Sequence, residues 1–391
     1  MLEWKKLGDV CEIKGRIGFR GYTRDDQVIK GEGAISLSPG NISDGVLCYD
    51  TCTYITWSKY EESPEIMVQD GDIILCKTAS VGKVARVKHL PEKATINPQL
   101  VLIKNIVINP QFLYYVLADN PFQSRIKGLA GVGSVPNVSQ AKLASISIPV
   151  PSIAEQTRIV GILDTFTASI ENLKQQIAQR HKQYEHYRDQ LLDLEGKEGV
   201  EMKTLGEICI IKNGYTPSTK NPDFWNNGSL PWFTLEDIRK NGRVLVDAIK
   251  HITPSGVKKG GLFPKDSIIV STTATIGEYA IIKTDFLCNQ QITCLSIKEI
   301  CKKQLLPKFL YYLADGIGKW CKQNVNGGGS LLIVSTSKLQ KKPIPVPSLQ
   351  DQSRIVSILD SFEASIANLE QQLAQRERQY EYYRNKLLTF E

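Results

Sequence analysis

The sequence has few of the residues from which metal sites and catalytic centres are usually built. It contains four histidines, and its nine cysteines stand singly, without a Cys-x-x-Cys pair. A structural zinc site normally takes four cysteine or histidine ligands at close paired spacing, so we expect no such site. We expect the cysteines to be reduced thiols, several of them buried as small apolar side chains.

Long apolar runs are also missing. No stretch reaches 18 consecutive apolar residues, and the first residues, MLEWKKLGDVCEIK, lack the apolar centre of a signal peptide. The 29 glycines and 18 prolines among 391 residues are ordinary for a globular protein. At roughly 100–200 residues per domain, the length predicts two to four domains. We therefore expect a cytoplasmic protein without a membrane partner.

Recognisable catalytic motifs are absent as well. The segment around Gly82 and Lys83 lacks the first glycine of a phosphate loop, and Val84 stands where serine or threonine is required. The strings that begin at Asn109 and Asn221 lack the second proline of an amino-methyltransferase loop. We found no nuclease-type carboxylate set, nucleophile elbow or HExxH. The sequence therefore favours a non-catalytic binding protein that holds no metal or cofactor of its own.

What the sequence does contain is an internal repeat. Residues 149–195 and 345–391 align without a gap at an offset of 196 and are identical at 30 of 47 positions. The segments before them repeat more faintly, as in LGDVCEIK and LGEICIIK or FLYYVLAD and FLYYLAD. The repeat predicts five segments: a globular block 1 (1–148), a helix (149–195), a linker (196–203), a globular block 2 (204–344) and a second helix (345–391).

Both repeated segments are typical of coiled-coil helices. Ser152 and Ser348 stand where N-caps belong, each with an acidic residue three positions later. Apolar residues then step by three and four, with one arginine in each stripe, as in a heptad seam. The seam consists of Ile170, Leu173, Ile177, Arg180, Tyr184, Tyr187, Leu191 and Leu194 in the first copy, and of Ile366, Leu369, Leu373, Arg376, Tyr380, Tyr383, Leu387 and Phe390 in the second.

The order of the segments predicts that the two helices pair antiparallel, with an internal pseudo-two-fold relation. At 1.5 Å per residue, the stretch from Ser169 to Glu195 would span roughly 40 Å, or on the order of 12 base pairs of duplex. An amphipathic helix that packs only on its own block remains the alternative. The expected fold class is α+β: two mixed α/β domains, each a twisted or barrel-like sheet with peripheral helices, joined by a pair of long antiparallel coiled-coil helices.

Charge is distributed unevenly along the chain. Of the net charge of +7, block 2 with the preceding linker carries 21 basic against 12 acidic residues, whereas each helix carries 5 against 7. Clustered positive charge favours a polyanion partner. The acidic helices are not expected to face that polyanion.

Polar recognition residues recur at matching places in the two blocks. Arginine and lysine suit guanine edges and phosphates, and asparagine and glutamine suit adenine. The Gly-rich tracts 128–134 and 327–330 are candidates for close approach to a backbone. The candidate DNA-binding residues are Lys14, Arg16, Arg20, Tyr22, Arg24, Lys77, Thr78, Ser80, Lys83, Asn97 and Gln99 in block 1, and Lys212, Asn213, Tyr215, Thr216, Ser218, Lys220, Thr272, Thr273, Thr275, Asn289, Gln290 and Gln291 in block 2.

With these features the chain resembles the specificity (S) subunit of Type I restriction–modification systems. The resemblance rests on two copies of PVPSxxxQxRIVxILDxF and on the opening of block 2, LGEICIIKNGYTPSTKNPDFW. Block 1 departs from that pattern, because 14–24 lack the Gly-x-Thr-Pro turn. The family implies two target-recognition domains that each read one half of a bipartite asymmetric double-stranded DNA site, across a spacer that is not read.

The resemblance also implies partners. Two modification (M) subunits would carry S-adenosylmethionine and methylate adenine, and restriction (R) subunits would add translocation that depends on ATP and Mg²⁺. We expect the M subunits to dock on an outer helix face with Arg158, Asp164, Arg354 and Asp360. A non-catalytic scaffold with two protein- or glycan-binding domains, and a standalone methyltransferase with degenerate motifs, remain as alternatives.

Overall fold

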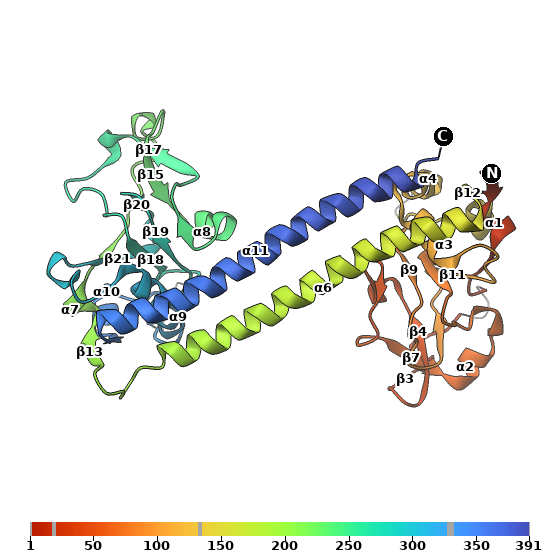
Figure 1. The fold of residues 1–391 in the computed structure, drawn as a ribbon, viewed down its shortest axis with the longest axis horizontal. Helices are drawn as coiled ribbons and strands as arrows, with labels where there is room; N and C mark the ends of the chain where they lie inside the picture. Colours follow the sequence, from red (N-terminus) through yellow and green to blue (C-terminus); the bar gives the residue numbers. More distant parts are fainter. Residues whose placement is uncertain (1, 18–20, 132–134, 327–331, 391) are drawn as a thin grey trace. The chain divides into compact units, whose positions relative to one another are not determined.

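The computed structural model describes residues 2–17, 21–131, 135–326 and 332–390. The chain forms two compact units: unit 1 comprises Met1–Lys174 and Gln371–Glu391, and unit 2 comprises Gln175–Glu370. Each unit thus holds one globular block together with part of each of two long helices, α6 (Ile153–Leu192) and α11 (Leu349–Leu388) (Figure 1). The expected α+β architecture, with two sheet-rich blocks and long helices, is confirmed.

Block 1 contains two four-stranded sheets. One is antiparallel, in the order β2-β11-β8-β9, and the other, β10-β4-β7-β3, contains one parallel pair, β10 with β4. Short helices and a β-hairpin complete the block. The elements are β2 (Glu12–Lys14), β3 (Gln27–Val28), β4 (Gly33–Leu37), β5 (Ile42–Ser43), β6 (Val46–Leu47), β7 (Thr53–Thr56), α2 (Trp57–Glu61), β8 (Ile73–Cys76), β9 (Val84–Arg86), β10 (Ala94–Ile96), β11 (Leu100–Lys104), α3 (Pro110–Ala118), α4 (Asn120–Leu129) and α5 (Gln140–Ala144).

The central strands of block 1 are apolar throughout because both of their faces are buried. In β8, Ile73 and Leu75 face the cluster that contains α3, whereas Ile74 and Cys76 face the second sheet. All four side chains have no exposed surface. Successive strand residues point to opposite faces, so a continuous apolar run indicates a sheet covered on both sides.

Block 2 repeats this plan with its eight strands divided unequally between two sheets. A five-stranded sheet in the order β14-β21-β18-β19-β16 stands beside a three-stranded sheet, β17-β15-β20. The two faces of β18 again belong to different clusters, with Ile268 and Val270 on one side and Ile269 on the other. The elements are β14 (Cys209–Asn213), β15 (Leu230–Phe233), α8 (Leu235–Asn241), β16 (Val244–Leu245), β17 (Lys250–Ile252), β18 (Ser267–Ser271), β19 (Tyr279–Ile282), β20 (Leu287–Cys288), β21 (Ile292–Ile297), α9 (Pro307–Gln323) and α10 (Thr336–Gln340).

A short strand pair closes each block just before its long helix. The segment before α6, β12 (Ser147–Val150), pairs antiparallel with β1 (Glu3–Lys6), and the segment before α11, β22 (Pro343–Val346), pairs with β13 (Glu201–Thr204) in the same way. Each opening strand leads directly into a one-turn helix, α1 (Leu7–Val10) or α7 (Leu205–Ile208). The first and last segments of each block are therefore neighbours.

The two long helices pair antiparallel within each unit. In unit 1, Phe166 stacks on Tyr383 and Lys174 lies 3.8 Å from Glu377. In unit 2, His181 lies 3.9 Å from Glu370, and Tyr187 stacks on Phe362. Residue numbers rise on one helix as they fall on the other, which is the antiparallel register expected from the sequence.

The helices differ from the expectation at their ends. Each is 40 residues long and begins directly after its serine cap, whose hydroxyl oxygen accepts a hydrogen bond from the third residue of the helix. Leu194 and Phe390 lie beyond the last helical residues, so their assignment to the helical seam was wrong. Leu194 joins the core of unit 2, and Phe390 packs edge-on against Phe112, so contacts with the blocks determine their places.

One buried glutamine in each unit joins the long helix to its block. The Gln352 side chain accepts a hydrogen bond from Leu306 N and donates to the carbonyls of Gln304 and Pro347. Gln156, at the offset of 196, bonds Asn109 N and Pro151 O. Leu306 and Asn109 directly precede α9 and α3, so each glutamine ties the first turn of a long helix to the start of a helix in the block.

We expect Gln352→Leu to lower the free energy of unfolding by about 3 kcal/mol, since it leaves buried backbone groups without partners. The measurement is urea denaturation of the full chain, followed by circular dichroism. Gln372→Leu, on the exposed surface of the same helix, is the matched control. Equal effects of the two substitutions would contradict the structural role of Gln352.

Candidate nucleic-acid interface

Two of the clusters expected from the sequence of block 1 meet at one edge of its sheets. Lys77 follows β8, and its N–H donates to the carbonyl of Gln99, in the turn between β10 and β11. In that turn, Asn97 and Gln99 bond each other through their side-chain amides. Arg16, from the loop after β2, donates to the carbonyl of Ile96. The loops after β2, β8 and β10 therefore form one surface, which we call the strand-end cluster of block 1.

Block 2 builds its strand-end cluster with the same backbone bonds. Thr272 N donates to Gln291 O, as Lys77 N does to Gln99 O, and the amides of Asn289 and Gln291 pair as those of Asn97 and Gln99 do. The turn after the strand repeats as well, since Ala79 and Ala274 both adopt positive φ, 63° and 64°. Non-glycine residues rarely adopt this conformation. The two blocks therefore share a backbone frame at this edge.

Different side chains stand on that shared frame. Lys77 of block 1 corresponds to Thr272 of block 2, and Lys83 corresponds to Glu278, because Cys76 N bonds Lys83 O as Ser271 N bonds Glu278 O. Glu278 forms an ion pair with Arg239 at 2.6 Å. The frame is held by main-chain groups, so these side chains can differ without loss of the fold.

Several predicted residues of block 1 bond other residues of the block through their polar side-chain atoms. Arg16 is 5% exposed and donates to Thr95 as well as to Ile96 O, and burial lowers the pKa of its guanidinium. Lys83 donates to two backbone carbonyls, and Lys14 pairs with Glu12 at 2.9 Å. Tyr22 and Thr78 are hydrogen-bonded to Ser36 and Asn137. Ser80 and Arg24 are exposed, and Arg20 lies outside the described residues, as do 132–134 of the first Gly-rich tract.

In block 2 the buried and exposed candidates separate clearly. Thr272 is buried and hydrogen-bonded to Thr293, which in turn donates to Asn213. Thr216 donates to Gln290, so the loop after β14 adjoins the turn before β21. Lys212, Ser218, Lys220 and Thr275 are exposed, Thr273 and Tyr215 are half-buried, and the second Gly-rich tract, 327–330, lies outside the described residues.

Sequence reasoning missed two residues at these edges. Asn137 bonds Thr78 and forms an isolated bridge with it, and Ile333 forms the matching bridge with Thr273. Each residue comes shortly after a Gly-rich tract, which was the available signal. The segments after the tracts therefore belong to the strand-end clusters.

The long helices present a second repeated surface. On each helix, small side chains follow an exposed residue at the first helical position, and their hydroxyls bond the carbonyl four residues earlier, as Thr157 bonds Ile153 O and Ser353 bonds Leu349 O. We call these rows the small-residue stripes. They consist of Ile153, Thr157, Gly161 and Thr165 on α6, and of Leu349, Ser353, Ser357 and Ser361 on α11, all exposed.

The structure corrects the expected docking face at two positions. Asp164 accepts hydrogen bonds from Tyr115 and Gln111 of α3, and Asp360 accepts one from Tyr312 of α9. These carboxylates face the blocks, so their assignment to the outer face was wrong. Burial, together with the hydrogen bond to the aspartate, raises the pKa of each tyrosine. Arg158 and Arg354 are exposed, with Glu155 at 2.6 Å and Asp351 at 3.8 Å.

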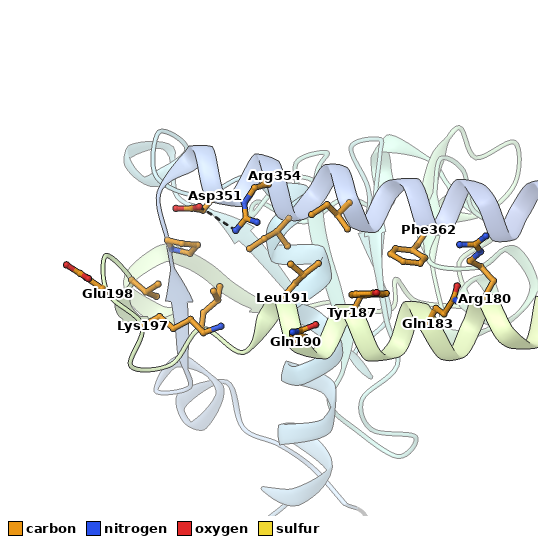
Figure 2. Close-up of a pocket in the computed structure, with 15 residues that line it drawn as sticks. Arg180, Gln183, Tyr187, Gln190, Leu191, Lys197, Glu198, Asp351, Arg354 and Phe362 are labelled. Carbon is orange, nitrogen blue, oxygen red and sulfur yellow. Dashed lines mark ion pairs between the residues drawn. The ribbon is translucent and has the colours of Figure 1, made fainter.

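Part of the expected seam is open in unit 2. A pocket of about 840 Å³ lies between α6 and α11 and reaches the linker residue Lys197. Figure 2 shows Tyr187 and Phe362 facing each other across it, with Arg180 beside Phe362. In unit 1 the same stack joins Phe166, Tyr383 and Arg376. The two phenylalanines were missed, although they continue the three-four spacing toward the helix start.

The remaining residues of the predicted seam differ in how far they are buried and in what they pack against. Leu173 and Ile366 are buried, whereas Tyr184 and Tyr380 are half-buried against the cores of their units, and so are Leu191 and Leu387. Ile170, Ile177, Leu369 and Leu373 are half-buried.

Within the described ranges, no three histidine, cysteine, aspartate or glutamate side chains are grouped so that they could hold a metal ion. Over the same residues, none of the helices is long and apolar enough to cross a membrane.

Comparison with known proteins connects this architecture to one family. The profile described as "Type I restriction modification DNA specificity domain" matches residues 1–180 and 197–378. The chain is 42% identical over 215 residues to the Escherichia coli "Type I restriction enzyme EcoprrI specificity subunit", covering 52% of this chain and 53% of that protein. It is 38% identical over 274 residues to the E. coli "Type I restriction enzyme EcoR124I/EcoR124II specificity subunit", covering 66% and 65%.

These matches span between half and two thirds of the two relatives' lengths. A solved structure supports the fold over the whole chain: the Type I restriction–modification S subunit from M. genitalium superposes with a TM-score of 0.59 at 16% identity, covering 100% of this chain and 97% of that one. Because the profile matches both halves of the chain, with their strand-end clusters and long helices, this protein belongs to the Type I restriction–modification DNA specificity family.

Proposed function

We propose that this chain is the sequence-specific DNA-binding subunit of a Type I restriction–modification complex and carries no catalytic centre. Block 1 and block 2 each read one half of a bipartite asymmetric site in double-stranded DNA. S-adenosylmethionine, ATP and Mg²⁺ act on partner M and R subunits. The observation that carries the proposal is the pair of strand-end clusters, which share backbone bonds but differ in side chains.

The distribution of polar groups supports a reading surface at these clusters. Direct reading of base edges needs side-chain amides, hydroxyls and cations on loops that a rigid frame positions. Ser80, Thr275 and Gln290 are exposed there, and the Asn97–Gln99 and Asn289–Gln291 pairs fix the turns beside them. Because Lys77 stands where block 2 has Thr272, the two blocks are expected to read different half-sites.

The proposal predicts which DNA the protein selects. The chain, assembled with a cognate M subunit, should select a bipartite motif with a fixed gap from random duplexes, read by sequencing at two salt concentrations. Exchange of block 2 for that of another family member should change one half of the motif only. A change in both halves, or weak unselective binding that salt abolishes, would contradict the proposal and favour a scaffold for protein or glycan partners.

We further propose that the paired helices fix the spacer between the half-sites. Each helix runs for 40 residues without a break. Insertion of one heptad into both helices adds about 10 Å, so the gap in the selected motif should lengthen by roughly 3 base pairs. The same selection measures the gap, and an unchanged gap would refute the spacer role.

The small-residue stripes are the surfaces that we assign to two M subunits. The hydroxyls of four stripe residues are already bonded to the helix backbone, so a partner helix can approach them closely without leaving these groups unsatisfied; they are those of Thr157, Thr165, Ser353 and Ser361. Arg158 and Arg354 border the stripes and offer charged contacts. Because the stripe occurs once on each helix, the complex is expected to hold one M subunit at each.

Arginine in a stripe should block one docking site. We expect Gly161→Arg or Ser357→Arg to reduce the bound M subunits from two to one, and the double variant to bind none, as measured by native mass spectrometry. A Cβ at Gly161 meets no atom within 4 Å, so the helix should remain intact. Glu185→Arg with Glu381→Arg, exposed positions on another helix face, is the control. Full M binding by the double stripe variant would exclude this surface.

A further inference from the structure

Tyr215 is held rigidly at the strand-end cluster of block 2. Its N–H donates to Cys288 O at 2.8 Å, and its carbonyl accepts from the indole of Trp232 at 3.0 Å. Its hydroxyl donates to Gly256 O at 3.3 Å and accepts from Lys258 N at 2.8 Å. Every polar atom of this residue is engaged, so the ring has a fixed orientation.

A second tryptophan secures the loop that follows. Trp225 donates its indole N–H to Ser218 O at 3.1 Å and packs edge-to-face on Trp232, with ring centroids 5.0 Å apart. The packed tryptophan pair therefore supports the loop that carries Ser218. Tyr215 was among the residues expected from the sequence, whereas Trp225 and Trp232 were not.

Lys258 lies over the fixed ring. Its Nζ is 4.5 Å from the centroid of Tyr215, within the range of a cation–π contact. The side chain is exposed, and no described acidic side chain forms an ion pair with it. Two other lysines of block 2, Lys240 and Lys283, are each paired with a carboxylate at 2.7 Å. Lys258 therefore presents a positioned charge that the block itself does not neutralise.

Block 1 has a cation–π pair of the opposite character. Arg16 lies 5.2 Å from the centroid of Tyr22, but it is buried and donates to Thr95 and Ile96. The Arg16 guanidinium therefore stabilises the fold of block 1. In block 2, by contrast, Lys258 over Tyr215 is exposed, as is Lys93 over Trp57 at 5.6 Å elsewhere in block 1.

We propose that Lys258 contacts a phosphate of the DNA backbone and that Tyr215 positions it. This inference rests on the proposed function. A lysine ammonium is a compact point charge suited to a phosphate. A lysine held over an aromatic ring has less side-chain motion to lose on binding than a freely moving lysine. Tyr215 adjoins Thr216, which bonds Gln290, so the charge lies beside the groups assigned to base reading.

The test measures how DNA affinity depends on salt. The chain with its M subunit is titrated with its selected duplex, and the slope of log K against log salt is compared among variants. Loss of one phosphate contact reduces the magnitude of that slope by about 0.9. We expect this reduction for Lys258→Ala, with the selected motif unchanged, and the full slope for Lys258→Arg. Lys259→Ala, an exposed neighbour with no ring beneath it, should keep the slope of the parent.

The role of Tyr215 has its own readout. Tyr215→Leu removes the ring while Lys258 remains, and it should reduce the slope as Lys258→Ala does, with no further reduction in the double variant. A full slope for Tyr215→Leu would overturn the positioning role. An unchanged slope for Lys258→Ala, or a changed motif in place of a changed slope, would overturn the phosphate contact. If the parent complex selects no bipartite motif, the proposed function itself fails.

Discussion

The structure depends on a hydrogen-bonding requirement at the point where each long helix meets its block. A helix start leaves backbone N–H groups without partners, and a buried junction gives no access to water. Gln156 and Gln352 meet this requirement with one side chain each, which both donates and accepts at the junction. Leucine there would fill the same space but leave these groups unpaired. Each junction therefore depends on a single amide to pair its buried backbone groups.

This requirement explains why the helices repeat so closely while the blocks do not. A helix segment must supply the serine cap, the glutamine, the aspartate that binds a tyrosine of the block and the small exposed residues, so its first turns are restricted at several positions. The strand-end clusters are held mainly by backbone hydrogen bonds, which form whatever side chain the residue carries. Lys77 and Thr272 can therefore occupy the same place in two frames, and divergence collects at the surface assigned to reading DNA.

The sequence was informative where local rules decide and uninformative where strand pairing decides. Serine caps and apolar spacing predicted the helices, because these signals act within a few residues. The same spacing could not show that Asp164 faces α3, since that depends on how the helix lies on the block. The contact between Asn97 and Gln99 could nearly be predicted, because the two residues are two positions apart. The contact of Gln99 with Lys77 could not, because it requires β8 and β11 to be neighbours. Arg16 looked like a DNA contact because basic side chains are usually exposed, whereas Thr95 and Ile96 enclose it.

The two blocks therefore use cations differently, and charge counts alone hide this difference. In block 1, Arg16 and Lys83 donate to backbone carbonyls of the block and Lys14 pairs with a neighbouring carboxylate, so these three cations are engaged by the block itself. In block 2, the aromatic side chains of Tyr215, Trp225 and Trp232 hold the recognition loop through ring packing and hydrogen bonds, where block 1 uses a buried cation. Lys258, over the ring of Tyr215, is exposed. Rigidity and positive charge are separate requirements of a DNA-reading loop, and each block meets them with different side chains.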